Sequence, residues 1–161
     1  KTEFVAEKAT ELGAAKIVPV VTRHSVVKSI NREKLETNII EAAEQCERLD
    51  LPALENLQDL PHLLAKWPAG RTLLFADESG GGVPFKDLLP SLSASPLAVL
   101  VGPEGGFSTE EQRLLRSKSF VKSFTMGPRI LRADTASVAA LACVQAWLGD
   151  WDDKPNFEAK A

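Results

Sequence analysis

The stretch LVGPEGGFSTEE, residues 100–111, decides the fold of this 161-residue chain. An apolar run ends at Val101, glycines follow at positions 102, 105 and 106, and a helix signal begins at Ser108. Ser108 with Glu111 three residues later forms a capping box, in which each side chain bonds the other residue's amide. Glycines let a ligand touch the main chain directly, and the amides at a helix start favour an anion or a polar group. The stretch therefore predicts a strand, a ligand-accessible loop and a helix in succession.

The same strand-then-loop pattern occurs at two other places in the chain. The apolar run Thr72–Ala76 precedes a glycine-rich loop at 77–82, and the alternating run Val121–Met126 precedes the loop 127–132. Helical periodicity is predicted at residues 3–13, 31–48, 57–66, 85–92, 108–117 and 134–148, with further strands at 16–21 and 97–101. Strands that are apolar on both faces and alternate with helices indicate an α/β fold, a parallel sheet flanked by helices. In such sheets ligands bind beyond the carboxyl ends of the strands, so we expect the three loops to meet there.

Composition excludes several classes of function. The 44% hydrophobic and 25% charged content is that of an ordinary globular protein, and no apolar run approaches the ~20 residues of a membrane span. A net charge of −3 leaves no overall basic surface for nucleic acid, so RNA binding would need a local patch. Cys46 and Cys143 are predicted to be small buried side chains of a reducing cytoplasm, and His24 and His62 have no ligand neighbours at metal spacing. We expect no metal site and no membrane association.

The loops themselves leave two interpretations open. The loop 102–106 lacks the Lys-Ser/Thr pair of a phosphate-binding loop, and Glu104 would repel phosphate, so a ligand with donors or a positive centre fits better. A tight turn without any ligand is an equally good reading of the spacing. In the loop 127–132, Arg129 and Arg132 flank an apolar pair that can wall a flat aromatic ligand. Alternatively, that loop packs under the last helix, with its arginines solvated or paired to Asp134.

Four motifs in order resemble the bacterial 16S ribosomal RNA uridine N3-methyltransferases of the SPOUT superfamily. They are ATELG (9–13), EAAEQCER (41–48), VGPEGGFSTEE (101–111) and MGPRILRADTA (126–136). The last motif departs from the family pattern ILR-T-E-T-A at Ala133 and Asp134, where aspartate keeps the charge of glutamate. The four motifs span nearly the whole chain.

The resemblance implies a SPOUT-type domain over residues 1–149 with a trefoil knot in its C-terminal segment, followed by a polar tail at 150–161. It implies a cytoplasmic homodimer that methylates N3 of a uridine in 16S rRNA or the small ribosomal subunit, with S-adenosylmethionine as cofactor. Family members also carry an N-terminal PUA-like RNA-binding domain, which is absent from this chain. Because the sequence opens at Lys1 without a methionine, we expect it to be the C-terminal catalytic domain of a longer protein.

The resemblance also assigns site residues. Those expected to bind the cofactor are Ala76, Glu78, Gly102, Pro103, Glu104, Gly105, Gly106, Met126, Gly127, Ile130, Leu131 and Ala136. Arg132 is expected to stabilise charge on a uracil oxygen, with Arg23 and Arg48 as partners of RNA phosphate or base. Arg48 shares one face of the helix 31–48 with Glu41 and Gln45, and a solvated polar ladder is the simpler reading of that face.

No general base is assigned from the sequence. The candidates are Glu11, Glu104 and Asp134, and water can suffice. Two other functions stay open: a SPOUT methyltransferase acting on another RNA position, such as a ribose 2′-hydroxyl, and a non-catalytic RNA-binding factor in ribosome assembly.

Overall fold

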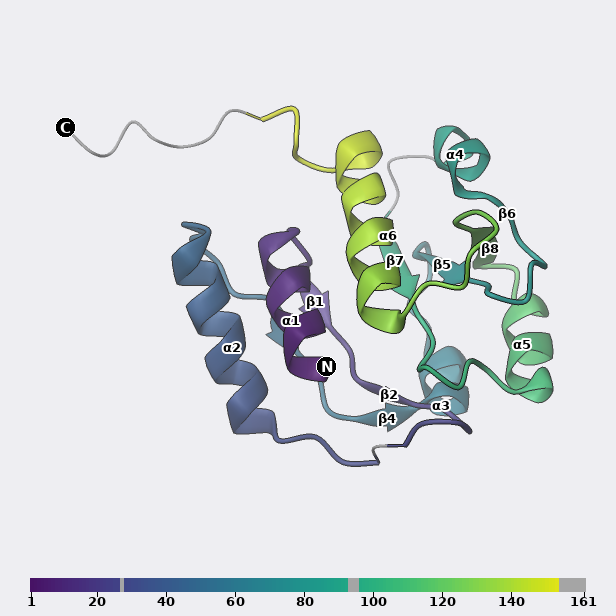
Figure 1. Cartoon of the computed structure of the whole chain (residues 1–161), viewed down its shortest axis with the longest axis horizontal. Coiled ribbons are helices and arrows are strands. Elements are labelled where there is room, and N and C mark those ends of the chain that lie inside the picture. The colour runs from purple at the N-terminus through teal and green to yellow at the C-terminus, as the bar shows by residue number, and fades with distance from the viewer. Residues whose placement is uncertain (27, 93–95, 154–161) are drawn as a thin grey trace.

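The computed structural model describes residues 1–26, 28–92 and 96–153. Its centre is a four-stranded, all-parallel sheet in the order β6-β8-β5-β7 (Figure 1). The strands are β5 (Thr72–Ala76), β6 (Val83–Pro84), β7 (Leu97–Leu100) and β8 (Val121–Thr125). Phe75 pairs with Leu100 on one side, and Ala76 pairs with Phe124 on the other. The carboxyl ends of β5, β7 and β8 therefore lie together, which confirms the predicted meeting of the three loops.

Helices cover both faces of this sheet, as the apolar strands predicted. On one face, α3 (Leu60–Ala65) and α5 (Thr109–Arg116) pack against β5 through a cluster that contains Leu64, Phe75 and Leu115. On the other face lie α4 (Phe85–Leu88), the 3-10 helix η1 (Leu89–Ser91) and α6 (Ala133–Leu148). Leu74, Phe124 and Ala140 are fully buried in that second cluster. The α/β layered fold is confirmed.

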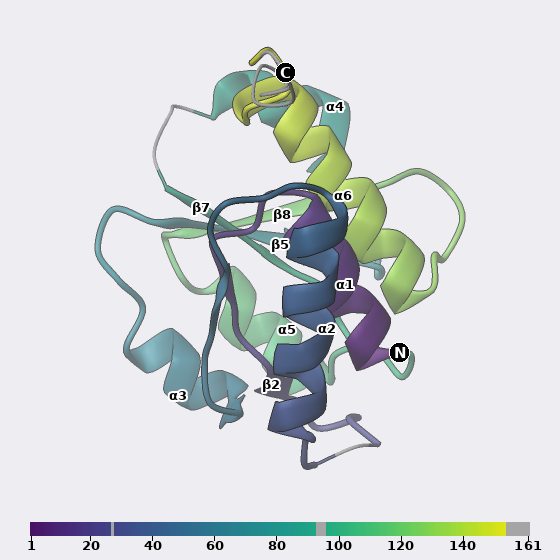
Figure 2. The ribbon, with the colours of Figure 1, turned by 90° about the vertical axis from the view of Figure 1, so that its left-hand side faces the viewer.

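The N-terminal part has its own small core. Ala6 of α1 (Thr2–Glu11) packs on Leu35 and Ile39 of α2 (Arg32–Gln45), and α1 lies between α2 and α6 (Figures 1 and 2). Two short parallel pairs accompany these helices. The strand β1 (Lys16–Ile17) pairs with β3 (Ala53–Leu54), and β2 (Val20–Val21) pairs with β4 (Gln58–Asp59).

Several predicted elements need correction. The single strand expected at 16–21 is two strands, because Pro19 has no amide to donate and interrupts the pairing. The helix expected at 57–66 begins at Leu60, since Asp59 caps it by accepting from the His62 amide at 2.8 Å. The helix expected at 85–92 is split into α4 and η1, and the strands β3, β4 and β6 were not predicted. These strands have two residues each, too few to show alternation.

The end of α2 and the cysteines also differ from expectation. The helix ends at Gln45 rather than Arg48, because Glu47 adopts a left-handed φ of 57°. Cys46 and Cys143 are exposed, not buried: the first caps the end of α2 and the second lies on the outer side of α6. The polar tail predicted at 150–161 lies outside the described residues from 154 onward.

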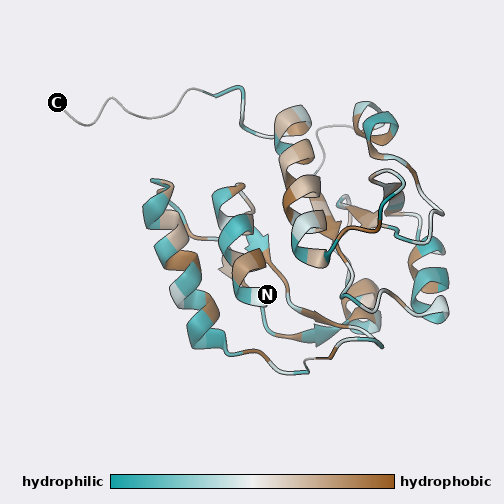
Figure 3. Ribbon diagram, viewed as in Figure 1, coloured by the Kyte–Doolittle hydropathy of each residue, from teal (hydrophilic) through white to brown (hydrophobic). Residues whose placement is uncertain are grey.

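The hydropathy of the helices separates α6 from the others. It is apolar over most of its length, whereas α2 and α5 mix polar and apolar positions (Figure 3). Ala136, Ser137 and Ala140 of α6 are buried, while Trp147 near its end is exposed. No helix in the described part of the chain is both long and apolar enough to cross a bilayer.

Candidate active site

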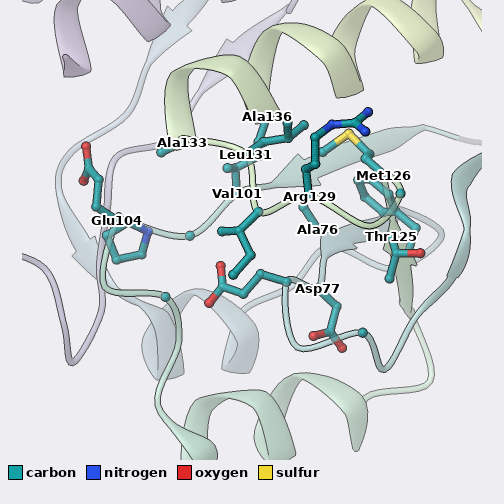
Figure 4. A pocket seen from close by; sticks show the side chains of 18 of the residues that line it. Ala76, Asp77, Val101, Glu104, Thr125, Met126, Arg129, Leu131, Ala133 and Ala136 are labelled. Carbon is teal, nitrogen blue, oxygen red and sulfur yellow. The ribbon is translucent and has the colours of Figure 1, made fainter.

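A pocket of about 290 Å³ opens at the carboxyl edge of the sheet (Figure 4). Its walls come from the loops after β5, β7 and β8 and from the first turn of α6. All twelve residues expected to bind a cofactor line it: Ala76, Glu78, Gly102, Pro103, Glu104, Gly105, Gly106, Met126, Gly127, Ile130, Leu131 and Ala136. The structure thus brings together residues from four separate segments. Their predicted role in binding a cofactor stays a prediction.

The pocket also contains residues that were not among those expected to bind the cofactor. They are Asp77, Gly80, Val101, Phe124, Thr125, Pro128, Arg129 and Ala133. Most of them are neighbours of predicted residues on the same loops. Glu104 lies at one end of the pocket, and Thr125, Met126 and Arg129 gather at the other (Figure 4).

The glycine loop is held close to the loop after β5. The amide of Phe107 donates to Glu78 Oε1 at 3.3 Å, and the amide of Gly106 donates to the carbonyl of Pro103 at 2.9 Å. Gly106 has a φ of +65°, and a Cβ at this position would overlap the Glu78 carboxylate. Glycine is therefore favoured here for its conformation, and a larger residue would also displace the Glu78 carboxylate from the Phe107 amide.

Asp77 anchors the loop after β5 to α5. It is 3% exposed. Its Oδ2 accepts from Arg116 Nη2 at 2.6 Å and from Nε at 3.1 Å, and its Oδ1 accepts from the Ser79 hydroxyl at 2.6 Å. A buried carboxylate is retained only when its lone pairs are bonded, and these donors meet that need. The C-terminal end of α5 therefore fixes the loop after β5.

Arg132 is the N-cap residue of α6. It is not among the residues that line the pocket, although its neighbours Leu131 and Ala133 are. The hydrogen bond from Lys1 holds the pKa of the exposed Glu104 below its usual value, and the charge of Arg132 adds to this effect. The Thr135 amide lowers the pKa of Asp134, again with a contribution from Arg132. Arg132 is thus close to the carboxylates of Glu104 and Asp134. One turn into α6, the Ser137 hydroxyl donates to the carbonyl of Ala133 at 2.7 Å.

The other two predicted arginines lie elsewhere. Arg23 is exposed in the turn after β2, and its amide donates to Glu111 Oε1 at 2.8 Å. The guanidinium of Arg48 bonds Asp50 and the carbonyls of Thr10 and Ala14, all at 2.9 Å. This places Arg48 between α1 and the end of α2, with a side chain only 13% exposed. Among the described residues, no hydrogen bond or ion pair joins any two of Arg23, Arg48 and Arg132.

The loop 126–132 provides the apolar side of the pocket. Ile130 is 83% exposed, and Gly127 has a φ of +93° with open space around its Cα. Met126 packs from the pocket side against the cluster under α6. The alternative interpretation, in which this loop packs beneath the last helix, is wrong for Ile130, which is exposed and lines the cavity.

The pocket combines an apolar wall, closely approaching main chain and carboxylates at Glu78 and Glu104, a combination that suits a ligand with a flat apolar part and a positive centre. No group of three or more His, Cys, Asp or Glu side chains that could hold a metal occurs in the described part of the chain. Fold and pocket together define an α/β domain that binds a small ligand at the carboxyl edge of a parallel sheet.

The sequence pattern of one known family, described as the RNA methyltransferase domain, matches residues 1–145. The chain belongs to this family. Its curated relatives include proteins called ribosomal RNA small subunit methyltransferase E. The one from Rickettsia conorii is 40% identical over 90% of this chain and 59% of the relative, and the one from Aquifex aeolicus is 34% identical over 87% and 60%.

Solved structures that are similar to this chain are also methyltransferases. A putative methyltransferase from Legionella pneumophila, in complex with bound S-adenosylmethionine, superposes with a TM-score of 0.77 at 32% identity. A ribosomal RNA small subunit methyltransferase E from Neisseria gonorrhoeae, also bound to S-adenosylmethionine, has a TM-score of 0.80 at 27% identity. They cover 90% and 93% of this chain, and 60% and 62% of their own lengths. The chain therefore spans about three fifths of the relatives it matches.

Proposed function

We propose that this chain is the catalytic domain of an S-adenosylmethionine-dependent methyltransferase that methylates N3 of a uridine in 16S rRNA. The pocket at the carboxyl edge of the sheet carries this proposal, because it gathers all twelve expected cofactor residues. Two similar structures were solved with S-adenosylmethionine, and the curated relatives are named for small-subunit rRNA methylation. The choice of uridine N3 rests on the resemblance of the four motifs.

The residues present fit this cofactor. The exposed Ile130, with Leu131 and Met126, offers an apolar surface for adenine, and Ala136 leaves room beside it. Main chain at 102–106 can bond the ribose and the amino-acid part, since glycine lets it approach closely. The carboxylates of Glu78 and Glu104 suit the positive sulfonium and ammonium groups.

The chain's own groups then act on the RNA. When bound, S-adenosylmethionine supplies a methyl group on a positively charged sulfur, a strong donor that needs no metal. N3 of uridine bears a proton, which leaves to solvent or to a carboxylate as the new N–C bond forms and the C–S bond breaks. Arg132 stabilises the negative charge that develops on a uracil oxygen, because its planar guanidinium offers two donors and stays charged. The target base must also be unstacked to reach the pocket.

The finer architecture is part of the same proposal. The C-terminal segment, β8 with the loop 126–132 and α6, forms a trefoil knot. The sheet order is compatible with this, because β8 lies between β6 and β5 although it follows both in the chain. Two copies form a homodimer with the site at their interface, in the cytoplasm. The exposed Trp147 on the apolar α6 is consistent with such a contact.

Calorimetric titration with S-adenosylmethionine, followed by mass mapping of methylated nucleosides, tests the proposal. The substrates are 16S rRNA and small subunits from cells that lack the enzyme. We expect 3-methyluridine as the product. A 2′-O-methylated nucleoside would move the activity to the ribose, and an absence of cofactor binding would leave a non-catalytic RNA-binding factor.

The same experiment tests whether methylation needs the additional length that the relatives have. We expect this chain alone to bind the cofactor but to modify rRNA poorly, because its net charge gives little attraction for RNA. Efficient methylation by the chain alone would show that the additional length of the relatives is dispensable.

A further inference from the structure

The turn 22–25 lies against two segments that are about eighty residues further along the chain. The turn closes on itself: the Thr22 amide donates to Ser25 Oγ at 2.9 Å, and the Ser25 amide donates to the Thr22 carbonyl at 3.1 Å. Thr22 is buried, whereas Arg23 and His24, at the tip of the turn, are exposed. In Figure 1 the segment after β2 runs toward the start of α5.

Glu111 bonds this turn to the start of α5. Its Oε2 accepts from the Ser108 amide at 2.8 Å, which is the ordinary bond of a capping box. Its Oε1 accepts from the Arg23 amide, also at 2.8 Å. A single carboxylate therefore holds two main-chain amides from opposite parts of the fold, and only one of these bonds serves the helix cap.

His24 bonds the turn to the glycine loop of the pocket. Its Nδ1 lies 2.8 Å from the carbonyl oxygen of Gly105. Because a carbonyl only accepts, Nδ1 carries the proton of this bond. A Cβ at Gly105 would lie 3.0 Å from His24 Cβ, so the turn also packs directly on this loop. Gly105 itself lines the pocket. The orientation of the peptide between Gly105 and Gly106 is thus set from outside the loop.

We propose that the turn 22–25 is a positioning element that couples Arg23 to the cofactor pocket. The bond to Glu111 fixes the backbone of Arg23 and so the position from which its side chain can contact RNA. The bond from His24 fixes the Gly105 carbonyl and with it the loop that lines the cofactor pocket. His24 and Glu111 are positioning residues, since they act through Gly105 and Arg23. The inference rests on the proposed function, because it takes RNA and S-adenosylmethionine as the two ligands.

Calorimetry with S-adenosylhomocysteine tests the link to the pocket without any RNA. His24→Leu removes the donor, and we expect the dissociation constant to rise about threefold to tenfold, the usual effect of one lost hydrogen bond. His24→Asn keeps an N–H close to the position of Nδ1 and should bind within about twofold of the wild type. Arg23→Ala keeps the backbone amide, so it should bind like the wild type.

The link to Arg23 is tested by matched changes in the capping box. Glu111→Gln leaves one acceptor oxygen for two amides, whereas Ser108→Ala weakens the cap without touching the turn. Single-turnover methylation of 16S rRNA is measured at saturating S-adenosylmethionine, which removes differences in cofactor affinity. Glu111→Gln and Arg23→Ala should both slow the reaction at least threefold, and Ser108→Ala should not. Thermal unfolding of each variant monitors stability.

The double variant His24→Leu/Glu111→Gln completes the test. Because both changes release the same turn, their effects on the dissociation constant should fall short of the product of the single effects. Unchanged affinity in His24→Leu, or equal loss in His24→Leu and His24→Asn, would overturn the coupling while the wild type still binds. If the wild type fails to bind S-adenosylhomocysteine, the proposed function itself is overturned.

Discussion

One wall of the pocket is bonded to the rest of the protein, whereas the other stands free. The loops 77–82 and 101–106, the bonded wall, are tied to α5 through Asp77 and Arg116 and to the N-terminal part through His24. In the loop 126–132, the open wall, the described residues show no side-chain hydrogen bond to another segment. We expect the bonded wall to be formed before a ligand binds, and the exposed residues of the open wall to gain contacts on binding.

The two walls are expected to contribute differently to cofactor affinity and to the stability of the free protein. A preformed wall fixes polar atoms where a cofactor needs them, so its loss should lower cofactor affinity and stability together. An open wall of apolar side chains contributes little to the free protein but buries surface when the ligand binds. Four predictions, built on five substitutions and one control, break or sharpen this contrast.

The largest effect is expected from Arg132→Ala at the end of the open wall. Loss of a charged donor to the developing oxyanion should lower kcat for rRNA methylation by about a hundredfold or more. Cofactor affinity should stay within a few-fold, because the proposed role of Arg132 is to contact the RNA base and not the cofactor. Steady-state kinetics and calorimetry measure the two separately, and normal turnover would eliminate the assigned role.

The second effect comes from Arg116→Met on the bonded wall. It leaves the buried Asp77 with only its Ser79 partner, and we expect unfolding free energy to fall by about 2 kcal/mol. Cofactor affinity should fall about tenfold as the loop after β5 loosens. Arg113→Met, an equal change at an exposed position of the same helix, should alter stability by less than about 0.5 kcal/mol. Equal losses in both variants would contradict the anchoring role of Asp77.

A third pair compares glycines on the two walls. Gly106→Ala forces a Cβ into the Glu78 carboxylate at a positive φ, so cofactor affinity should fall about tenfold and stability by 1 to 2 kcal/mol. Gly127→Ala has the same backbone strain but no neighbour to meet, and about 1 kcal/mol of stability should be lost. Denaturant unfolding and calorimetry with S-adenosylhomocysteine test both variants. A larger loss of stability in Gly127→Ala than in Gly106→Ala would contradict the proposed difference between the bonded wall and the open wall.

The smallest effect on the free protein is expected from Ile130→Ser. The side chain is 83% exposed, so stability should change by less than about 0.5 kcal/mol. Cofactor affinity should nevertheless fall several-fold, because burial of the isoleucine against adenine is lost. Unfolding curves and calorimetry give the two numbers, and an unchanged affinity would remove Ile130 from the site.

The sequence predicted the central sheet because β5 and β7 are long enough and apolar enough to be recognised. Most residues expected to bind the cofactor could be named because they lie in contiguous motifs around Gly102 and Gly127, and the structure gathers them in one pocket. What holds these motifs was not predictable: Arg116 follows Asp77 by 39 positions, and His24 precedes Gly105 by 81. Such long-range bonds leave no periodic signal in the sequence.

The N-terminal part was harder to predict for another reason. Its strands have two residues each, and their pairing depends on the neighbouring chain rather than on alternation. Arg48 illustrates the problem on the level of a single side chain. Its predicted contact with RNA stays a prediction, whereas the bonds by which its guanidinium joins the end of α2 to α1 could not be predicted from the motif.

The central position of β5 has a consequence for how this chain is made. Leu73 pairs with Ala98 and with Val121, so both partners of the strand emerge from the ribosome after it. Until they arrive, the run Thr72–Ala76 is an apolar segment with unpaired edges, the kind of stretch that aggregates. Pairing between residues distant in sequence also slows folding. We therefore expect the nascent chain to depend on chaperones until β8 has been synthesised.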